Sequence, residues 1–291
     1  MKALLELVRA PAALSVPGDM MAGAAAAGRR AAPGLALSSV LVYWAGMALN
    51  DWADREADAA ERPERPIPSG RVRPGTALGI AAGLTGTGLI AAAVSGGRRA
   101  LGVAGLLAGA VWAYDLGLKR TPLGPVTMAT CRALDVLLGA GPQVRAAAPM
   151  ALAIGAHTYG ISILGRAEVA GATVKTVRGA LAASTAAAGL AAVSCLRDGS
   201  SSSGSSSNGA AARAGAALLL AGHLAATIPA QARLRARPDP EQVRKAVQAS
   251  ILGLIPLQAA AVAGRGRLPA AGALLGALPA GRWLSARMAT S

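Results

Sequence analysis

The sequence predicts an all-α protein, a polytopic bundle of nine or ten transmembrane helices formed as one domain by residues 1–291. The chain has a mean hydropathy of +0.45 and only 15% charged residues, whereas a soluble domain carries about 25%. Apolar runs of roughly 18 to 22 residues recur along the whole length, each long enough to cross a hydrocarbon core. The composition includes 37 Gly and no Phe, and small residues let membrane helices approach closely.

The expected helices follow the apolar runs in chain order, and charged, Gly-rich or Pro-rich segments separate them. The spans are residues 11–28, 34–53, 75–95, 100–117, 123–141, 148–165, 177–196, 212–231, 242–263 and 268–286. The last two spans are separate only if the segment GRGRLP between them forms a turn. The chain then has ten helices, and otherwise nine. Residues 198–209, DGSSSSGSSSNG, are expected to form a flexible loop because they can bury nothing.

The net charge of +15 raises the question of nucleic-acid binding, but the basic residues lie between apolar runs and form no compact face with interleaved aromatic residues. Of the 29 Lys and Arg residues, 19 fall on the side of both termini and nine on the other. This asymmetry places both termini in the cytoplasm. An excess of residues with GC-rich codons suggests a bacterial genome, so we expect a multi-pass protein of the bacterial inner membrane, with a lipid bilayer and no nucleic acid among its partners.

The segment NDWADREAD, residues 50–58, places an amide and three aspartates at the cytoplasmic end of the second span. On a helical continuation, Asn50, Asp54 and Asp58 lie four residues apart and share one face. Oxygen groups in such a row repel one another unless a cation lies among them, and Mg²⁺ is typically held by one or two carboxylates plus substrate phosphates. We therefore predict a metal-bridged diphosphate as the partner. The alternative is a solvated helix end whose charges only stop the span.

The loops on the same side carry cations that match a diphosphate. Arginines follow the aspartates, and YDLGLKRTPLGP ends the fourth span with an acid and two bases. These residues are Arg62, Arg65, Arg71, Arg73, Asp115, Lys119 and Arg120. Arg and Lys bind phosphate oxygens well. Alone they would be topology anchors, but beside an acidic metal site they predict phosphate binding.

These segments resemble the UbiA superfamily of membrane prenyltransferases, in which N-D-x-x-D-x-x-x-D leads into R-P-x-x-S-G. The matching residues are Asn50, Asp51, Asp54, Asp58, Arg65, Pro66, Ser69 and Gly70. The resemblance covers most of the chain and implies a helical bundle with a central cavity that opens to lipid. It also implies a transferase that uses Mg²⁺ to hold a prenyl diphosphate and moves the isoprenoid group to a small acceptor, often an aromatic ring.

Taken together, the residues and the resemblance give a set of expected site residues. The expected catalytic residues are Asp51, Asp54, Asp58 and Tyr159. The expected substrate-binding residues are Arg65, Lys119, Arg120, Arg132 and Arg166. The expected Mg²⁺ ligands are Asn50, Asp54, Asp58 and Glu168.

The second aspartate-rich motif of the family, D-x-x-Y-x-x-x-D-x-x-x-D, is degenerate in this chain. The segment AHTYGISILGRAEVAG keeps Tyr159 but has Ala156, Ile163 and Ala167 where acids are expected, which leaves Glu168 as the acidic ligand. Either one metal with nearby basic residues suffices for catalysis, or the chain is a non-catalytic or weakly catalytic protein that binds prenyl lipids or assists their transport. The string HTYGISILGRAEV is similar to the UbiA-like member of bacterial ebo gene clusters, which are linked to secondary metabolism.

Ionisable and aromatic residues inside the spans complete the candidates. Arg132 and Asp135 lie three residues apart in the fifth span, either as a structural ion pair or as a substrate contact. His157 is more readily explained as a hydrogen-bonded helix residue than as a ligand, and His223 as a packing residue. Four aromatic residues either line the cavity or anchor the helices at the membrane interface; they are Tyr43, Trp44, Trp112 and Tyr114.

Overall fold

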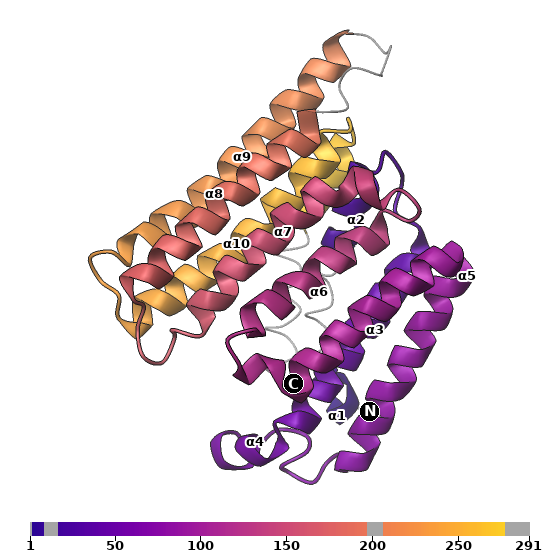
Figure 1. The fold of residues 1–291 in the computed structure, drawn as a ribbon, viewed down its shortest axis with the longest axis vertical. Coiled ribbons are helices and arrows are strands. Elements are labelled where there is room, and N and C mark those ends of the chain that lie inside the picture. The colour runs from indigo at the N-terminus through magenta and orange to yellow at the C-terminus, as the bar shows by residue number, and fades with distance from the viewer. Residues whose placement is uncertain (1, 9–16, 197–205, 277–291) are drawn as a thin grey trace.

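The computed structural model describes residues 2–8, 17–196 and 206–276, which form a helical bundle and contain no strand (Figure 1). Its helices are α1 (Lys2–Leu7), α2 (Pro17–Ala26), α3 (Pro33–Ala53), α4 (Arg55–Glu61), α5 (Pro74–Leu116), the short η2 (Leu118–Arg120), α6 (Gly124–Gly139), α7 (Val144–Gly165), α8 (Val174–Leu196), α9 (Ser206–Arg233) and α10 (Pro240–Ala263). Residues 268–276 are also helical. The predicted all-α class is confirmed.

The predicted spans correspond in order to these helices. The third and fourth spans are the two arms of α5, which reverses direction at Gly97, where φ is 68° and ψ is −162°. Only glycine adopts such a conformation without steric cost. The fifth span was predicted slightly too long, because α6 has 16 residues. The described part of the first span is helical over Pro17–Ala26.

Some expectations fall beyond the residues that the structure describes. Residues 11–16 of the first predicted span and residues 277–286 of the last one lie outside them. The same holds for residues 198–205 of the predicted Gly/Ser loop, whereas residues 206–209 already belong to α9.

Helix starts follow local signals in the sequence. Pro33, Pro74 and Pro240 lie in the first turns of α3, α5 and α10, where a missing N–H leaves no hydrogen bond unmade. Asp239 caps α10 by accepting a hydrogen bond from the Gln242 N–H at 3.0 Å. An N-cap of this kind typically contributes about 1 kcal/mol.

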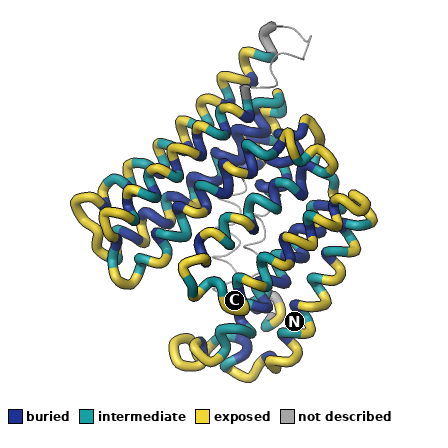
Figure 2. Tube along the Cα trace, in the orientation of Figure 1, coloured by how far each residue is buried: buried dark blue, intermediate teal, exposed yellow. Residues whose placement is uncertain are grey.

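Five of the described helices, α5, α7, α8, α9 and α10, are long and apolar enough to cross a membrane. Large apolar side chains cover their outer faces; Ile90, Val94 and Leu218 are 65%, 83% and 74% exposed. A continuous surface of this kind is unfavourable in water and matches lipid. Of these helices α10 is the most buried, whereas α5 and α9 lie at the periphery (Figure 2). The chain is therefore a multi-pass membrane protein.

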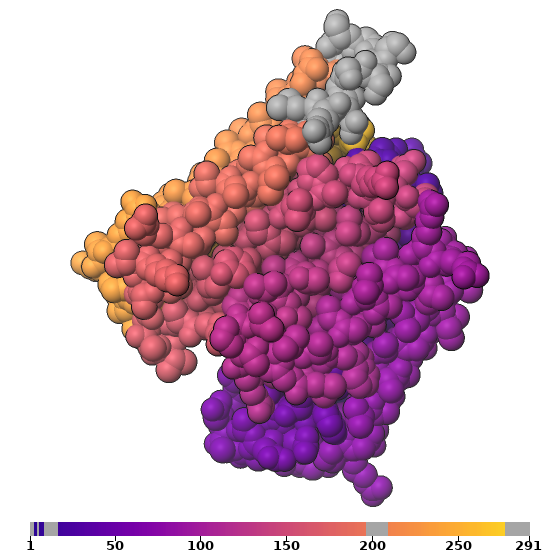
Figure 3. All heavy atoms as spheres, in the orientation of Figure 1, coloured from indigo at the N-terminus to yellow at the C-terminus, as the bar shows by residue number. Residues whose placement is uncertain are grey.

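The bundle has two halves that meet along α6 and α7. One half contains α2, α3, α5 and α6, and the other contains α7 to α10. In Figure 3 the purple N-terminal part of the chain and the orange part toward its C-terminus occupy opposite sides of the molecule. Within the first half α3 packs along α5, and within the second half α8 and α9 each pack against their chain neighbours. A second junction between the halves joins α2 to α10.

Glycines allow α2 to lie directly against α6. A Cβ added at Gly23 would lie 1.8 Å from the Val136 carbonyl oxygen, and one at Gly139 would lie 2.4 Å from the Met20 carbonyl oxygen. No larger residue fits at either position, so the predicted close packing through small residues is confirmed here. This approach brings Asp19 of α2 next to α6.

The loop that follows α4 is fixed to the end of the bundle. Leu7 of α1 packs with Ile67 and Val72 of this loop against the end of α3, and Glu6 pairs with Arg71 at 2.5 Å. The loop therefore holds a defined position beside the aspartates of α3 and α4.

Candidate active site

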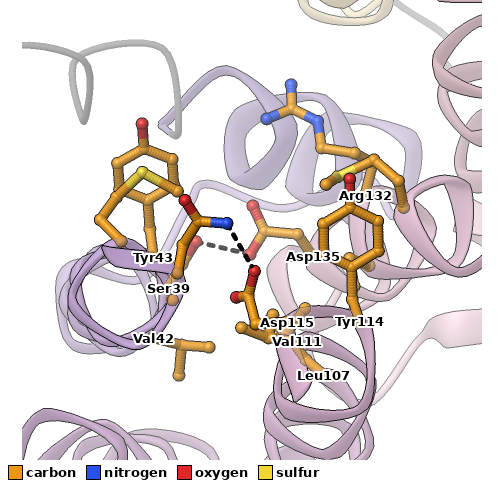
Figure 4. A pocket seen from close by; sticks show the side chains of 14 residues that line it. Ser39, Val42, Tyr43, Leu107, Val111, Tyr114, Asp115, Arg132 and Asp135 are labelled. Atoms are coloured by element: carbon orange, nitrogen blue, oxygen red, sulfur yellow. Dashed lines mark hydrogen bonds between the residues drawn. The ribbon is translucent and has the colours of Figure 1, made fainter. Parts of the chain in front are cut away.

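A cavity of about 330 Å³ lies between α3, α5 and α6. In Figure 4 the side chains from α3 face those from α5 and α6 across this space. The lining residues are Ser39, Val42, Tyr43, Gly46, Met47, Asn50, Leu107, Val111, Tyr114, Asp115, Met128, Cys131, Arg132 and Asp135. Asn50 and Ser39 lie on the same helix but about 16 Å apart along it, at 1.5 Å per residue, so the cavity has two polar levels with apolar residues between them.

The first level is the mouth cluster, which we define as Asn50, Asp54, Asp115, Lys119 and Arg120. Lys119 Nζ donates to Asp54 Oδ2 at 2.7 Å and lies 3.6 Å from Asp115 Oδ1. Asn50 Nδ2 donates to the same Asp115 oxygen at 2.9 Å. Arg120 donates to Asp54 Oδ1 at 3.0 Å. The Lys119 side chain is only 11% exposed and that of Asp115 only 5%, so these charges act on each other more strongly than in water.

Local backbone geometry explains how these side chains meet. Asp54 has φ of −95° and ψ of 5°, which ends α3 and starts α4 one residue later. Its carboxylate therefore faces the short helix η2. That helix carries Lys119 and Arg120 in one turn and ends where the Thr121 hydroxyl donates to the Leu118 carbonyl at 2.8 Å.

The electrostatic surroundings of Asp54 favour its ionised form. Partial burial alone would raise its pKa, but hydrogen bonds and positive charge from Lys119 and then Arg120 outweigh that effect. The pKa of Asp54 therefore lies below its usual value of 3.8. A carboxylate that is ionised at neutral pH is the form that binds a cation.

Asp51 and Asp58 lie apart from the mouth cluster and share a different cation. Arg65 Nη1 donates to Asp58 Oδ2 at 2.5 Å and lies 3.4 Å from Asp51 Oδ1. Both aspartates are 4% exposed. The structure thus divides the predicted row, because Asn50 joins Asp115 and Asp54 joins Lys119, whereas Asp58 joins Arg65. Spacing along one helix face could not show this, since the partners come from different loops.

The second polar level is the inner cluster, which we define as Asp19, Ser39, Arg132, Asp135 and Gln258. Arg132 contacts both oxygens of Asp19, with Nε 2.8 Å from Oδ2 and Nη2 3.2 Å from Oδ1. Gln258 Nε2 donates to Asp19 Oδ1 at 2.7 Å, and Ser39 Oγ donates to Asp135 Oδ1 at 2.5 Å. The considered pairing of Arg132 with Asp135 is therefore replaced by a pair with Asp19. The sequence signal for this partner was Asp19 itself, a lone aspartate in the apolar start of the first span.

The remaining predicted site residues lie in or after α7. Tyr159 is 38% exposed and does not line the cavity. Glu168 lies in the connection from α7 to α8, likewise outside the cavity lining, and makes no ion pair within the described part of the chain. Arg166 donates to the Thr121 carbonyl directly after η2. The structure thus brings Arg166 against the segment that carries the mouth cluster, but not Tyr159 or Glu168.

The two histidines have structural partners. His157 is buried, with Nε2 2.8 Å from the Ser250 carbonyl and Nδ1 3.2 Å from the Ser184 hydroxyl. The His223 ring meets it edge-on, with the ring centroids 4.6 Å apart. The interpretation of both as hydrogen-bonded packing residues is confirmed.

The aromatic candidates divide between the cavity and its surroundings. Tyr43 and Tyr114 line the cavity, whereas Trp44 and Trp112 do not. Trp112 Nε1 instead donates to the Thr85 hydroxyl at 3.1 Å, between the two arms of α5.

The mouth cluster provides a donor set that suits Mg²⁺. Among the residues described, no three or more His, Cys, Asp or Glu side chains converge as a metal site. Asp54 and Asp115 nevertheless approach one cation, the Lys119 ammonium group, and Asn50 donates to Asp115 Oδ1 through its amide nitrogen. Two carboxylates, completed by water and phosphate oxygens, fit the coordination preference of Mg²⁺.

The fold and the site together define a multi-pass helical membrane protein with a largely apolar internal cavity and a charged mouth. The chain belongs to the UbiA prenyltransferase family, whose model matches residues 15–252. The resemblance inferred from the sequence is therefore confirmed.

Individual relatives agree with this membership. A digeranylgeranylglyceryl phosphate synthase of Methanopyrus kandleri is 42% identical over 131 residues, which are 42% of this chain and 46% of the relative. The bacteriochlorophyll synthase 33 kDa chain of Cereibacter sphaeroides is 37% identical over 106 residues, covering 34% and 33% of the two chains. The alignments thus span about half or less of these relatives.

The solved structure of a digeranylgeranylglyceryl phosphate synthase shares the fold across nearly the whole chain. It superposes with a TM-score of 0.71 at 20% identity, covering 92% of this chain and 99% of that one. At this identity the similarity establishes the helical architecture alone.

Proposed function

We propose that this protein transfers an isoprenoid group from a prenyl diphosphate to a small acceptor in a reaction that depends on Mg²⁺. The observation that carries the proposal is the meeting of Asp54, Lys119 and Asp115 at the mouth of an apolar cavity. A prenyl diphosphate has the complementary parts, because its head is anionic and its tail is apolar. Membership of a prenyltransferase family and relatives that are named synthases support the same reaction.

Each part of the mouth has a role in this proposal. Asn50, Asp54 and Asp115 would hold Mg²⁺, which when bound neutralises charge on the departing diphosphate. Lys119 and Arg120 would bind phosphate oxygens. Asp115 enters this ligand set because it shares Lys119 with Asp54, whereas Glu168 and Asp58 are not brought to the mouth cluster.

The surroundings of the mouth also contribute. Asp51 and Asp58 would position Arg65 and with it the loop beside the mouth. The apolar lining, including Leu107 and Val111, would exclude water that could capture the prenyl group in place of the acceptor. The family tyrosine Tyr159, outside the cavity, would act at most on its entrance.

The charge distribution supports a proposal for the position of the protein in the cell. We place the protein in the bacterial inner membrane with the mouth cluster toward the cytoplasm, because 19 of the 29 Lys and Arg residues lie on that side. A role in secondary metabolism rests on the resemblance of residues 157–169 alone. The alternative of a non-catalytic prenyl-lipid carrier gains no support from relatives that are synthases.

The proposal can be tested with membranes that contain the full chain. They are incubated with labelled geranyl, farnesyl or geranylgeranyl diphosphate and Mg²⁺, and lipid extracts are analysed by mass spectrometry. We expect a prenylated product that requires Mg²⁺ and is lost in Lys119→Ala. The control Asp239→Asn changes an aspartate at the start of α10, outside the cavity lining, and should retain activity. Binding of the diphosphate without any turnover would overturn the transferase and favour the carrier.

A further inference from the structure

The inner cluster presents hydrogen-bonding atoms to the cavity that no neighbouring residue uses. Asp135 accepts from Ser39 through Oδ1 only, and Arg132 contacts Asp19 through Nε and Nη2 only. Within the described residues Asp135 Oδ2 and Arg132 Nη1 have no hydrogen-bond partner, and both residues line the cavity. Figure 4 shows both side chains on the wall opposite Tyr43. Two residues of the cavity lining thus each keep one hydrogen-bonding atom that no described residue uses.

A prenyl tail does not suit this end of the cavity. Asp135 is 6% exposed, and covering its free oxygen with hydrocarbon would leave a buried hydrogen-bonding atom without a partner, which is costly. The apolar residues between the two polar levels, such as Val42 and Val111, offer the tail a better surface. The inner cluster therefore calls for a polar ligand.

The charges of the inner cluster also limit the kind of polar ligand. Arg132 is already paired through two nitrogens with Asp19, which is fully buried. Asp135 adds a second carboxylate, so the cluster holds two acids against one base. Because Arg132 is already paired, a carboxylate or phosphate on the ligand would be buried here without a counter-ion, which is costly. Uncharged hydroxyl groups can donate to Asp135 Oδ2 or accept from Arg132 Nη1.

The position of the cluster agrees with a ligand that reaches toward the mouth. Ser39 lies about 16 Å along α3 from Asn50 at 1.5 Å per residue. A diphosphate head at the mouth leaves the intervening part of the cavity for its first isoprene unit and for the acceptor. With about 330 Å³ in total, the acceptor must be small.

We propose that Arg132 and Asp135 form the acceptor subsite and that this subsite selects a small, uncharged, hydroxylated acceptor. The inference rests on the proposed transferase function and adds the chemical class of its second substrate. Asp19, Ser39 and Gln258 hold the two binding side chains in place.

The test compares matched acceptors that differ in charge. Purified full-length protein in lipid nanodiscs is given geranylgeranyl diphosphate, Mg²⁺ and either glycerol or sn-glycerol 1-phosphate, and in a second pair 4-hydroxybenzyl alcohol or 4-hydroxybenzoate. We expect the uncharged member of at least one pair to have a kcat/KM at least about 10-fold higher than its anionic partner. This comparison needs no variant.

A variant then assigns the selection to Asp135. Asp135→Asn keeps the side-chain size and should raise the KM for the uncharged acceptor about 10-fold, while the KM for geranylgeranyl diphosphate stays unchanged. Asp135→Asn should also reduce the difference in kcat/KM between the uncharged and the anionic acceptors. Asp239→Asn, which removes an equal charge far from the cavity, should change neither value.

The outcomes separate the inference from the function on which it rests. Transfer that favours the anionic acceptors, or an acceptor KM that Asp135→Asn leaves unchanged, overturns the subsite while the transferase stands. If no acceptor is prenylated and no diphosphate is released, the transferase proposal itself is overturned, and the subsite with it.

Discussion

Replacing Asp54 with asparagine removes one negative charge from the mouth cluster but keeps the size of the side chain. The contact to Arg120, whose side chain is 67% exposed, should contribute at most about 1 kcal/mol. The contact to Lys119 is more enclosed, and a hydrogen bond to a charged group contributes about 1.5–3 kcal/mol. In the Asp54→Asn variant Lys119 still has Asp115 as an ionic partner at 3.6 Å. We therefore expect Asp54→Asn to lower the free energy of unfolding by about 2 kcal/mol.

The effect on catalysis should be larger than the effect on stability. Asparagine cannot replace an ionised ligand of Mg²⁺, and it leaves Lys119 and Arg120 without the carboxylate that positions them. A loss of about 4 kcal/mol of stabilisation on the departing diphosphate corresponds to a rate about 10³-fold lower. Prenyl transfer by Asp54→Asn should therefore be close to undetectable.

The stability difference between wild type and Asp54→Asn should depend on pH. The pKa of Asp54 is lowered in the folded protein from the usual 3.8. The stabilisation is therefore fully present above pH 3.8 and is lost as the pH falls through the lowered pKa. Asparagine does not titrate, so the two proteins should approach equal stability in strong acid.

Two assays check this reasoning. Chemical unfolding of both proteins in the same detergent, followed from pH 7 to pH 2.5, measures the stability difference, and labelled geranylgeranyl diphosphate measures transfer. The reasoning is refuted if folded Asp54→Asn turns over at the wild-type rate, or if the stability difference is the same at every pH.

Three further changes test other parts of the structure. Asp115→Asn should lower kcat/KM for the prenyl diphosphate at least about 100-fold in a steady-state assay, because about 3 kcal/mol of charge stabilisation is lost. Gly46→Val should weaken prenyl diphosphate binding about 10-fold in a titration, because an added Cβ would lie 2.9 Å from Val111 Cγ1 at the cavity wall. His157→Leu should lower the free energy of unfolding by about 1–3 kcal/mol in a denaturant titration, because the Ser250 carbonyl loses its partner. The same variant should keep the wild-type KM for the prenyl diphosphate.

The sequence by itself determined the elements of the fold and the location of the mouth. Apolar runs, prolines at helix starts and Gly97 at the reversal of α5 are local signals, because each depends on a few adjacent residues. Asn50, Asp54, Lys119 and Arg120 were likewise found from short motifs. Their meeting at one end of the bundle followed from the order of spans.

Only the tertiary structure decided which charges share a partner. Asp54 and Asp58 are four residues apart, yet one pairs with Lys119 and the other with Arg65. Arg132 finds its partner in Asp19, 113 positions away, instead of Asp135 three positions away. Residue spacing defines the face of a helix on which a side chain lies, whereas the opposing group depends on how closely two helices approach and at what register. That approach is set by contacts between small residues far apart in the chain, which no local pattern records.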